Sequence, residues 1–455
     1  MLTKRKDRVR PLFTILALLS SISCSQLVHE EPPTPPGTGE EDFANMAIED
    51  AQDADDAEAQ TQEPERLKIK AVERVSVNDA GQDANGSSMH PSVSSDGRLI
   101  AFVSQAANLG ADNPRGLWQV YLRDRDAGHT QLVSLGIDGS EGNGDSFFPQ
   151  LSHDGRFVLF VSHASNLTDE DTNDLPDLIL HDRHAGTRER IVVGPAEEVG
   201  WRHVELFRPQ ISADGRFIAY VSDVAWYGDE GDVRVPQLYL MDRSSGSSRR
   251  LSQDLAGRPA KVSSGDPYLS HNGRYLIFVS AAPDLVAATP PSGYFHVYLY
   301  DTQDESLTLM DFGLPRLTEV STPDIDVQGS PECFSPLISE DGRWVHCYSE
   351  LSFFPGLVVH DRKTGTTQRL RSWWPSPPRQ LSWSQSASRL NFDGALCNQS
   401  LSQCGVIHAE DLGFPNMGFA EGVISAEARS LALTVLDHAN GSGSSSIVAL
   451  EVSDD

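Results

Sequence analysis

The sequence predicts an all-β protein, and within that class a seven-bladed β-propeller of four-stranded antiparallel blades. Three observations support this prediction. The pattern Pro-x-apolar-Ser-x-Asp-Gly-Arg recurs along the chain, as in residues 149–156. A run of apolar residues follows each Asp-Gly turn, which is typical of a strand. The turn residue recurs at spacings of 58, 60, 58 and 69 residues, at Asp96, Asp154, Asp214, Asn272 and Asp341. Such repetition is the signature of a repeat architecture.

Each unit is expected to contain four strands. The first is the Pro-x-apolar-Ser segment, and the second follows the Asp-Gly turn, as in residues 99–104. The third ends in a charged turn, as in residues 120–125, and the fourth is exemplified by residues 249–252. A glycine between the third and fourth strands, such as Gly128, supplies the positive φ that a short hairpin requires.

The end of the chain predicts how the array closes. Residues 383–392 and 424–433 are weaker copies without Asp-Gly, which brings the number of units to seven, and the last unit has only three strands. Residues 74–77 match residues 131–134, the end of the first unit, so we expect this N-terminal strand to join the last blade. Closure would remove exposed sheet edges. Because the last two units are degenerate, a six-bladed ring with an irregular C-terminal region is the alternative.

The N-terminal residues predict export. Residues 1–24 combine a basic start, an apolar run from Leu12 to Ile22, and Cys24. They read as a signal peptide. The segment 21–24 resembles a bacterial lipobox, which implies that Cys24 is lipidated and that Ser25 behind it directs the protein to the outer membrane. The alternative is a plain signal peptide. No later segment is apolar enough to span a bilayer, so membrane attachment is expected through the lipid anchor only.

The chain after the signal peptide divides in two. Residues 25–66 are rich in proline and acidic residues and poor in large apolar ones, so we expect a disordered tether. Residues 67–455 are expected to form the propeller. The formal net charge is −29, from 65 acidic and 36 basic residues. This balance excludes nucleic acid as the partner, because phosphate contacts require Lys and Arg.

The repeated motif resembles PD40, the WD40-like (TolB-type) β-propeller repeat of exported bacterial proteins. The resemblance covers about residues 72–455. Together with the lipobox-like segment 21–24, it implies an exported lipoprotein of the cell envelope, periplasmic or surface-exposed. The repeat specifies no activity, because it serves many roles.

One loop has the spacing of a calcium site. Asp169, Asp171, Asn173 and Asp177 place oxygen atoms at positions 1, 3, 5 and 9, and Ca²⁺ prefers several such ligands. The alternative is an acidic surface loop. No other cofactor is expected.

Four cysteines follow Cys24. Cys333 and Cys347 flank one Asp-Gly turn, and Cys397 and Cys404 flank a short polar loop. Local disulfide pairing of each couple is expected in an exported protein, with free buried thiols as the alternative.

The residues just before the first strand of each unit are the remaining candidates for a binding site. His90, Phe148, Arg208, Asp266 and Ser335 would gather at one mouth of the channel, where a polar ligand or peptide could bind. The alternative is ordinary loop variation. There is no Gly-x-Ser-x-Gly elbow of a hydrolase domain. We therefore expect a non-catalytic envelope scaffold that binds a protein, peptide or glycan at one face. The alternative function is an enzyme, a lyase or glycan hydrolase, with its site in the central channel.

Overall fold

The computed structural model divides the chain into two units, Met1–Glu65 and Arg66–Asp455. It describes residues 65–66, 69–110, 113–169, 171, 176–191, 209–222, 235–288, 295–310, 312, 333–349, 356–371, 381–383, 389–392, 395–398, 404–406, 417–424, 430–437 and 445–452. The predicted signal peptide, Cys24 and nearly all of the tether lie outside these residues. All the regular secondary structure in these ranges is β-strand. The described residues contain no helix long and apolar enough to cross a membrane.

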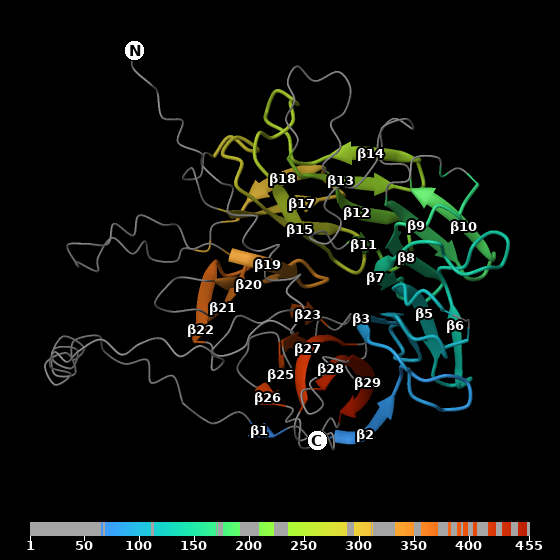
Figure 1. The fold of residues 1–455 in the computed structure, drawn as a ribbon. Coiled ribbons are helices and arrows are strands. Elements are labelled where there is room, and N and C mark those ends of the chain that lie inside the picture. Colours follow the sequence, from blue (N-terminus) through green and yellow to red (C-terminus); the bar gives the residue numbers. More distant parts are fainter. Residues whose placement is uncertain are drawn as a thin grey trace, which may run out of the picture. The chain divides into compact units, whose positions relative to one another are not determined.

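The strands form antiparallel sheets in which chain neighbours pair in order (Figure 1). The first sheet contains β3 (Ser88–Val93), β4 (Leu99–Ser104), β5 (Gln119–Asp124) and β6 (His129–Leu132). The second contains β7 (Ser146–Leu151), β8 (Phe157–Ser162), β9 (Asp177–Asp182) and β10 (Thr187–Ile191). The third contains β11 (Gln210–Ile211), β12 (Phe217–Ser222), β13 (Gln237–Asp242) and β14 (Ser247–Arg250).

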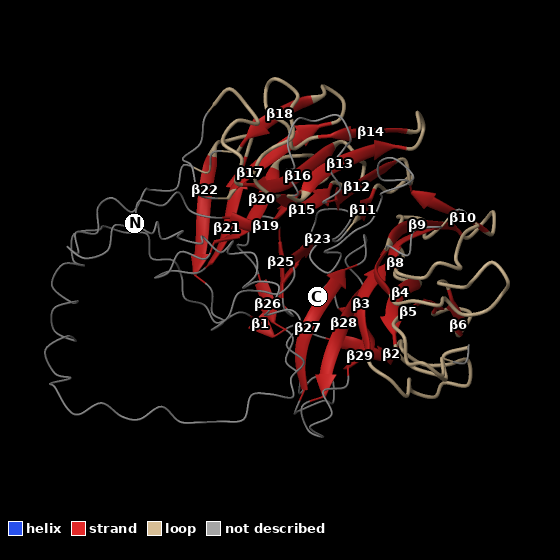
Figure 2. Ribbon diagram, turned by 45° about the horizontal axis from the view of Figure 1, so that its top comes forward, coloured by secondary structure: helices blue, strands red, loops and turns tan. Residues whose placement is uncertain are grey.

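The C-terminal half continues this pattern (Figure 2). The fourth sheet contains β15 (Ser264–Leu269), β16 (Tyr275–Ser280), β17 (His296–Asp301) and β18 (Ser306–Leu309). The fifth contains β19 (Cys333–Ile338), β20 (Trp344–Ser349), β21 (Gly356–Asp361) and β22 (Thr366–Arg371). Next come β23 (Leu381–Trp383), β24 (Arg389–Phe392), β25 (Ala395–Asn398) and β26 (Cys404–Val406).

The last sheet combines both ends of the second unit. Its order is β2 (Ile69–Arg74), β29 (Ser445–Val452), β28 (Ser430–Asp437) and β27 (Met417–Ile424). β1 (Glu65–Arg66) lies at the boundary of the two units. Within the described residues the prediction of an all-β fold with four-stranded antiparallel sheets is confirmed for six sheets, and the sheet of β23 to β26 has β1 as a fifth strand. The second strand of the first unit has the predicted bounds.

The recurring motif is a hydrogen-bonded turn followed by an ion pair. In the second sheet, Ser152 Oγ donates to Asp154 Oδ1 at 2.8 Å, and the Arg156 N–H donates to the same oxygen at 2.9 Å. Gly155 adopts a φ of +64°, a conformation that favours glycine. The Arg156 guanidinium then pairs with Asp182 at the end of β9, at 2.6 Å, and this pairing holds the pKa of Asp182 well below its usual value. Four other sheets repeat this ion pair, as Arg98–Asp124, Arg216–Asp242, Arg274–Asp301 and Arg343–Asp361.

The glycines of the Asp-Gly and Asn-Gly turns also pack closely against the preceding sheet. A Cβ added at Gly215 would lie 2.4 Å from Cδ2 of Phe157, which begins the second strand of the preceding sheet. Gly155, Gly273 and Gly342 meet Leu99, Phe217 and Tyr275 in the same way. The motif therefore specifies both the turn and the packing of one sheet against the next, which explains its recurrence without any chemistry.

The hydrophobic core lies between adjacent sheets. Val158 and Phe160 of β8 pack with Ala101 and Val103 of β4. The first and last sheets share a cluster in the same manner, in which Phe102 packs with Ala449. The first strands also contact one another in sequence, from β3 to β7, β11, β15, β19, β23 and β27, and β27 contacts β3.

The fourth strand of a unit ends in a repeated bulge. The Val133 and Ser134 N–H groups both donate to the Val120 carbonyl, and the Val75 and Ser76 N–H groups both donate to the Ile447 carbonyl. The predicted match is therefore wrong by one position, because the equivalents of residues 74–77 are 132–135 rather than 131–134. The predicted strand at 74–77 is β2, Ile69–Arg74, which ends at Arg74 because the bulge interrupts the ladder there.

Candidate functional site

The first strands carry a repeated irregularity at the residue before the proline. Their pairing with the second strand shifts register at this point in β3, β7, β15 and β19. The residue concerned has a positive φ of 47° to 54° in all four strands: His90, Phe148, Asp266 and Ser335. These are four of the five residues predicted for the channel mouth, and the fifth, Arg208, lies outside the described residues.

A positive φ is unusual for residues other than glycine and costs free energy, so four occurrences at one equivalent position are a specific feature of these strands. A bulge re-aims the side chain that it carries. Asp266 and Ser335 are exposed, His90 is half-buried and Phe148 is buried. The rings of His90 and Phe148, on adjacent sheets, lie 4.6 Å apart. The sequence indicated these residues but not the bulge, because a residue before proline ordinarily adopts an extended conformation.

The predicted calcium loop is described in part. Asp169 is exposed and Asp171 is half-buried, whereas Asn173 lies outside the described residues. Asp177 is 3% exposed and lies at the start of β9. Among the described residues, no group of three or more His, Cys, Asp or Glu side chains is placed to hold a metal ion. Calcium binding by this loop remains a prediction.

Asp177 instead takes part in a buried ion pair. Its Oδ2 lies 2.8 Å from Nε of Arg190, and both side chains are at most 5% exposed. Burial raises the pKa of Asp177 to about 6, against the lowering effect of Arg190. Gln119 holds the equivalent place in β5, five residues before the turn aspartate, and its Nε2 donates to the Gly142 carbonyl at 2.9 Å. The residue equivalent to Asp177 in the first sheet thus has a structural role, because it holds the backbone at Gly142.

The cysteines lie on paired strands. Cys333 and Cys347 are joined by a disulfide with a Cα–Cα distance of 5.4 Å. Cys397 of β25 and Cys404 of β26 are register partners. Disulfide formation by the second pair remains a prediction.

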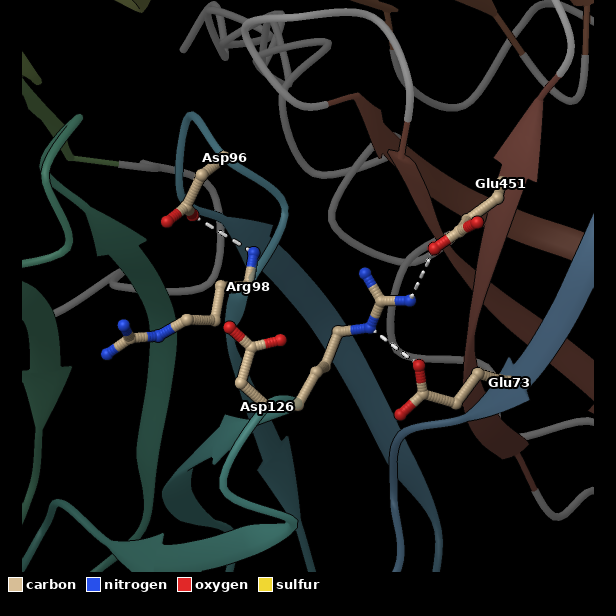
Figure 3. A pocket seen from close by; sticks show the side chains of 6 residues that line it. Glu73, Asp96, Arg98, Asp126 and Glu451 are labelled. Atoms are coloured by element: carbon tan, nitrogen blue, oxygen red, sulfur yellow. Dashed lines mark hydrogen bonds and ion pairs between the residues drawn. The ribbon is translucent and has the colours of Figure 1, made fainter.

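A charged hollow of about 370 Å³ lies where the last sheet meets the first (Figure 3). Arg125 is its central residue. The Arg125 Nε lies 2.7 Å from Glu73 of β2, and Nη2 lies 3.7 Å from Glu451 of β29. An internal junction uses the same arrangement, since Arg243 of the third sheet pairs with Glu189 of β10 at 3.1 Å. The hollow is therefore a junction between sheets, in which Arg125 pairs with both Glu73 and Glu451.

The antiparallel sheets, whose first strands contact one another in a circuit, are consistent with a β-propeller. No protein-family model matches the chain, and no curated protein matches it. An oligogalacturonate lyase from Vibrio parahaemolyticus is 11% identical with a TM-score of 0.50, over 86% of this chain and 99% of the lyase.

Two further solved structures are similar at lower scores. TolB from Acinetobacter baumannii is 16% identical with a TM-score of 0.37, and the match covers 74% of this chain and 60% of TolB. An acylaminoacyl peptidase from Pyrococcus horikoshii is 11% identical with a TM-score of 0.49, over 81% of this chain and 51% of the peptidase. At 11% identity the match to the lyase shows the fold alone.

Proposed function

We propose that this protein is a non-catalytic scaffold of the cell envelope that binds a protein, peptide or glycan at one face of a closed seven-bladed propeller. In this proposal Cys24 carries the lipid anchor in the outer membrane. Residues 25–66 are the tether, and the propeller stands in the periplasm or at the surface. The basic n-region, the apolar run and the lipobox-like segment 21–24 support the location.

Closure is supported by the contacts between the chain ends. β2 pairs with β29 from Ile69↔Val452 to Arg74↔Val448. The first strands contact one another in a complete circuit. Each sheet would then be one blade, and β2 would be the fourth strand of the last blade. Such a ring would leave no sheet edge open between the first and last blades.

The repeated positive-φ bulge is the observation that carries the binding role. Four first strands carry different side chains at one equivalent position: a half-buried imidazole, a buried phenyl ring, an exposed carboxylate and an exposed hydroxyl. A purely structural strain would be relieved by glycine, yet none of the four residues is glycine. Backbone strain that persists at equivalent positions points to a functional surface. Mixed polar and aromatic side chains suit a peptide or a glycan.

The polar residues of the repeated motif give no comparable support for a catalytic role. The serine, aspartate and arginine of the motif are engaged in the turn and in the ion pair that follows it. The enzyme alternative, a lyase or glycan hydrolase, would require reacting groups elsewhere in the channel. Turnover of a glycan with time, rather than its retention, would favour that alternative.

Site-specific photo-crosslinking tests the proposal. A photoreactive amino acid is placed at Asp266 or Ser335 in the full chain expressed in cells. The control position is Ser245, which is equally exposed but lies in the turn between β13 and β14. We expect discrete crosslinked products from Asp266 and Ser335 and none from Ser245. Identical products from all three positions, or none from the first two, would overturn the binding role.

A further inference from the structure

Two histidines far apart in the sequence meet at equivalent turns. His153 and His271 occupy the position between the serine and the turn residue in the second and fourth sheets. Ala213 holds this position in the sheet between them. The His153 N–H donates to the Ala213 carbonyl at 3.3 Å, and the Ala213 N–H donates to the His271 carbonyl at 2.8 Å. Because alanine has only a methyl group, it leaves room for the two imidazoles to meet.

The imidazoles face each other through ring nitrogens. His153 Nδ1 lies 2.5 Å from His271 Nε2, and the ring centroids are 4.5 Å apart at an interplanar angle of 50°. Both side chains are half-buried. Burial, together with the neighbouring His153, lowers the pKa of His271 to about 4.

We propose that His153 and His271 together form a binding site for a divalent transition metal ion of the zinc class. Imidazole nitrogen suits Zn²⁺, and water molecules would complete a tetrahedral shell around the two protein ligands. Zn–N distances of about 2.0–2.1 Å place two tetrahedral ligands about 3.3 Å apart. The two rings therefore separate by less than 1 Å to admit the ion.

One carboxylate acts on the pair. Asp214, in the turn beside Ala213, opposes the larger lowering effects of burial and of His153 on the pKa of His271. Asp214 is itself fixed, because its Oδ1 accepts from Ser212 Oγ at 2.6 Å and from the Arg216 N–H at 2.9 Å. This site is separate from the bulge residues, so it does not depend on the proposed binding role.

Zinc titration of the full chain, prepared without a polyhistidine tag, tests this proposal. Isothermal titration calorimetry at pH 7.5 is compared among the wild type, His153→Ala, His271→Ala and His184→Ala. His184 is the matched control, because it is an exposed histidine in the turn between β9 and β10. We expect one Zn²⁺ per chain at this site. Its affinity should fall at least tenfold in each of the first two variants and remain unchanged in the control.

A second readout separates loss of the site from loss of the fold. Urea unfolding in EDTA shows whether each variant is folded, and Zn²⁺ should raise the unfolding midpoint of the wild type and of His184→Ala only. His153→Asn replaces the alanine variant if the latter does not fold. Equal zinc binding by all variants, or no binding by the wild type, would overturn the proposal and leave a hydrogen-bonded histidine pair.

Discussion

Ile447 donates its backbone N–H to Oγ of Ser76 at 3.1 Å, across 371 residues of chain. The same bond occurs within single sheets, where Val120 donates to Ser134 and Leu238 donates to Ser252. The two ends of the second unit are thus joined by the contact that ends the fourth strand of an ordinary repeat. The N-terminal strand is built into the last sheet as a repeat strand.

Replacement of Ser76 by alanine should therefore destabilise the fold, as the same change does inside a repeat. Ser134→Ala should cost somewhat more, because Ser134 Oγ also donates to Gln119 Oε1. Ser76, Ser134 and Ser252 are all at most 4% exposed. Loss of the acceptor leaves a buried N–H without that partner, which costs about 1–3 kcal/mol of unfolding free energy. Urea denaturation of Ser76→Ala and Ser134→Ala measures this. A neutral Ser76→Ala beside a destabilising Ser134→Ala would contradict the equivalence.

A glycine of the repeated motif should tolerate alanine less well than a glycine of the hairpin between a third and a fourth strand. Gly215 and Gly186 have similar φ angles of +70° and +67°, but a Cβ at Gly215 meets the Phe157 ring whereas a Cβ at Gly186 meets nothing within 4 Å. Both substitutions incur about 1 kcal/mol of backbone strain. Gly215→Ala should cost about 1–3 kcal/mol more because of overpacking. Denaturation midpoints measure the difference, and equal losses would show that the packing between sheets is not specific here.

Acid should destabilise the fold through histidines whose pKa is lowered. Burial lowers the pKa of His181 to about 4, the same value to which burial and His153 lower that of His271. The unfolded chain takes up these protons near pH 6.5, so stability is complete above that pH and falls as pH decreases toward 4. The slope of unfolding free energy against pH reflects the number of protons taken up on unfolding. His271→Asn should lower that number by up to one. Denaturation at several pH values tests this, with His184→Asn as the control. A slope unchanged by His271→Asn would contradict it.

Calcium should raise the melting temperature if the loop at Asp169–Asp177 binds it. A cation would relieve the repulsion between Asp171 and Asp177, which contributes to the raised pKa of Asp177. The rise should disappear in Asp171→Ala and persist in Asp138→Ala, an exposed aspartate of another loop. Identical melting curves in Ca²⁺ and in chelator would contradict calcium binding and leave Arg190 as the partner that neutralises the Asp177 carboxylate.

The sequence was most informative where the repeat is regular. Residues 99–104 form the predicted strand because the Asp-Gly turn fixes its start. The match of residues 74–77 was wrong by one position, although the pair that aligns the two copies is visible in the sequence as Val75–Ser76 and Val133–Ser134. The bulge at this pair could not be predicted, because it depends on pairing with a strand far away in the chain. The pairing of His153 with His271 could not be predicted either. It depends on two turns 118 residues apart and on the small side chain of Ala213 between them.

Cysteine crosslinking of the two chain ends tests closure most directly. Ala71 and Glu451 are register partners in β2 and β29, and both are exposed. In Ala71→Cys/Glu451→Cys we expect a disulfide on mild oxidation, seen by mass spectrometry under non-reducing conditions. It should stabilise the fold by about 5 kcal/mol because it closes a very long loop. The control, Ala71→Cys/Gln303→Cys, places the second thiol in an exposed turn of the fourth sheet. Crosslinking no greater than in this control would contradict a ring closed by its N-terminal strand.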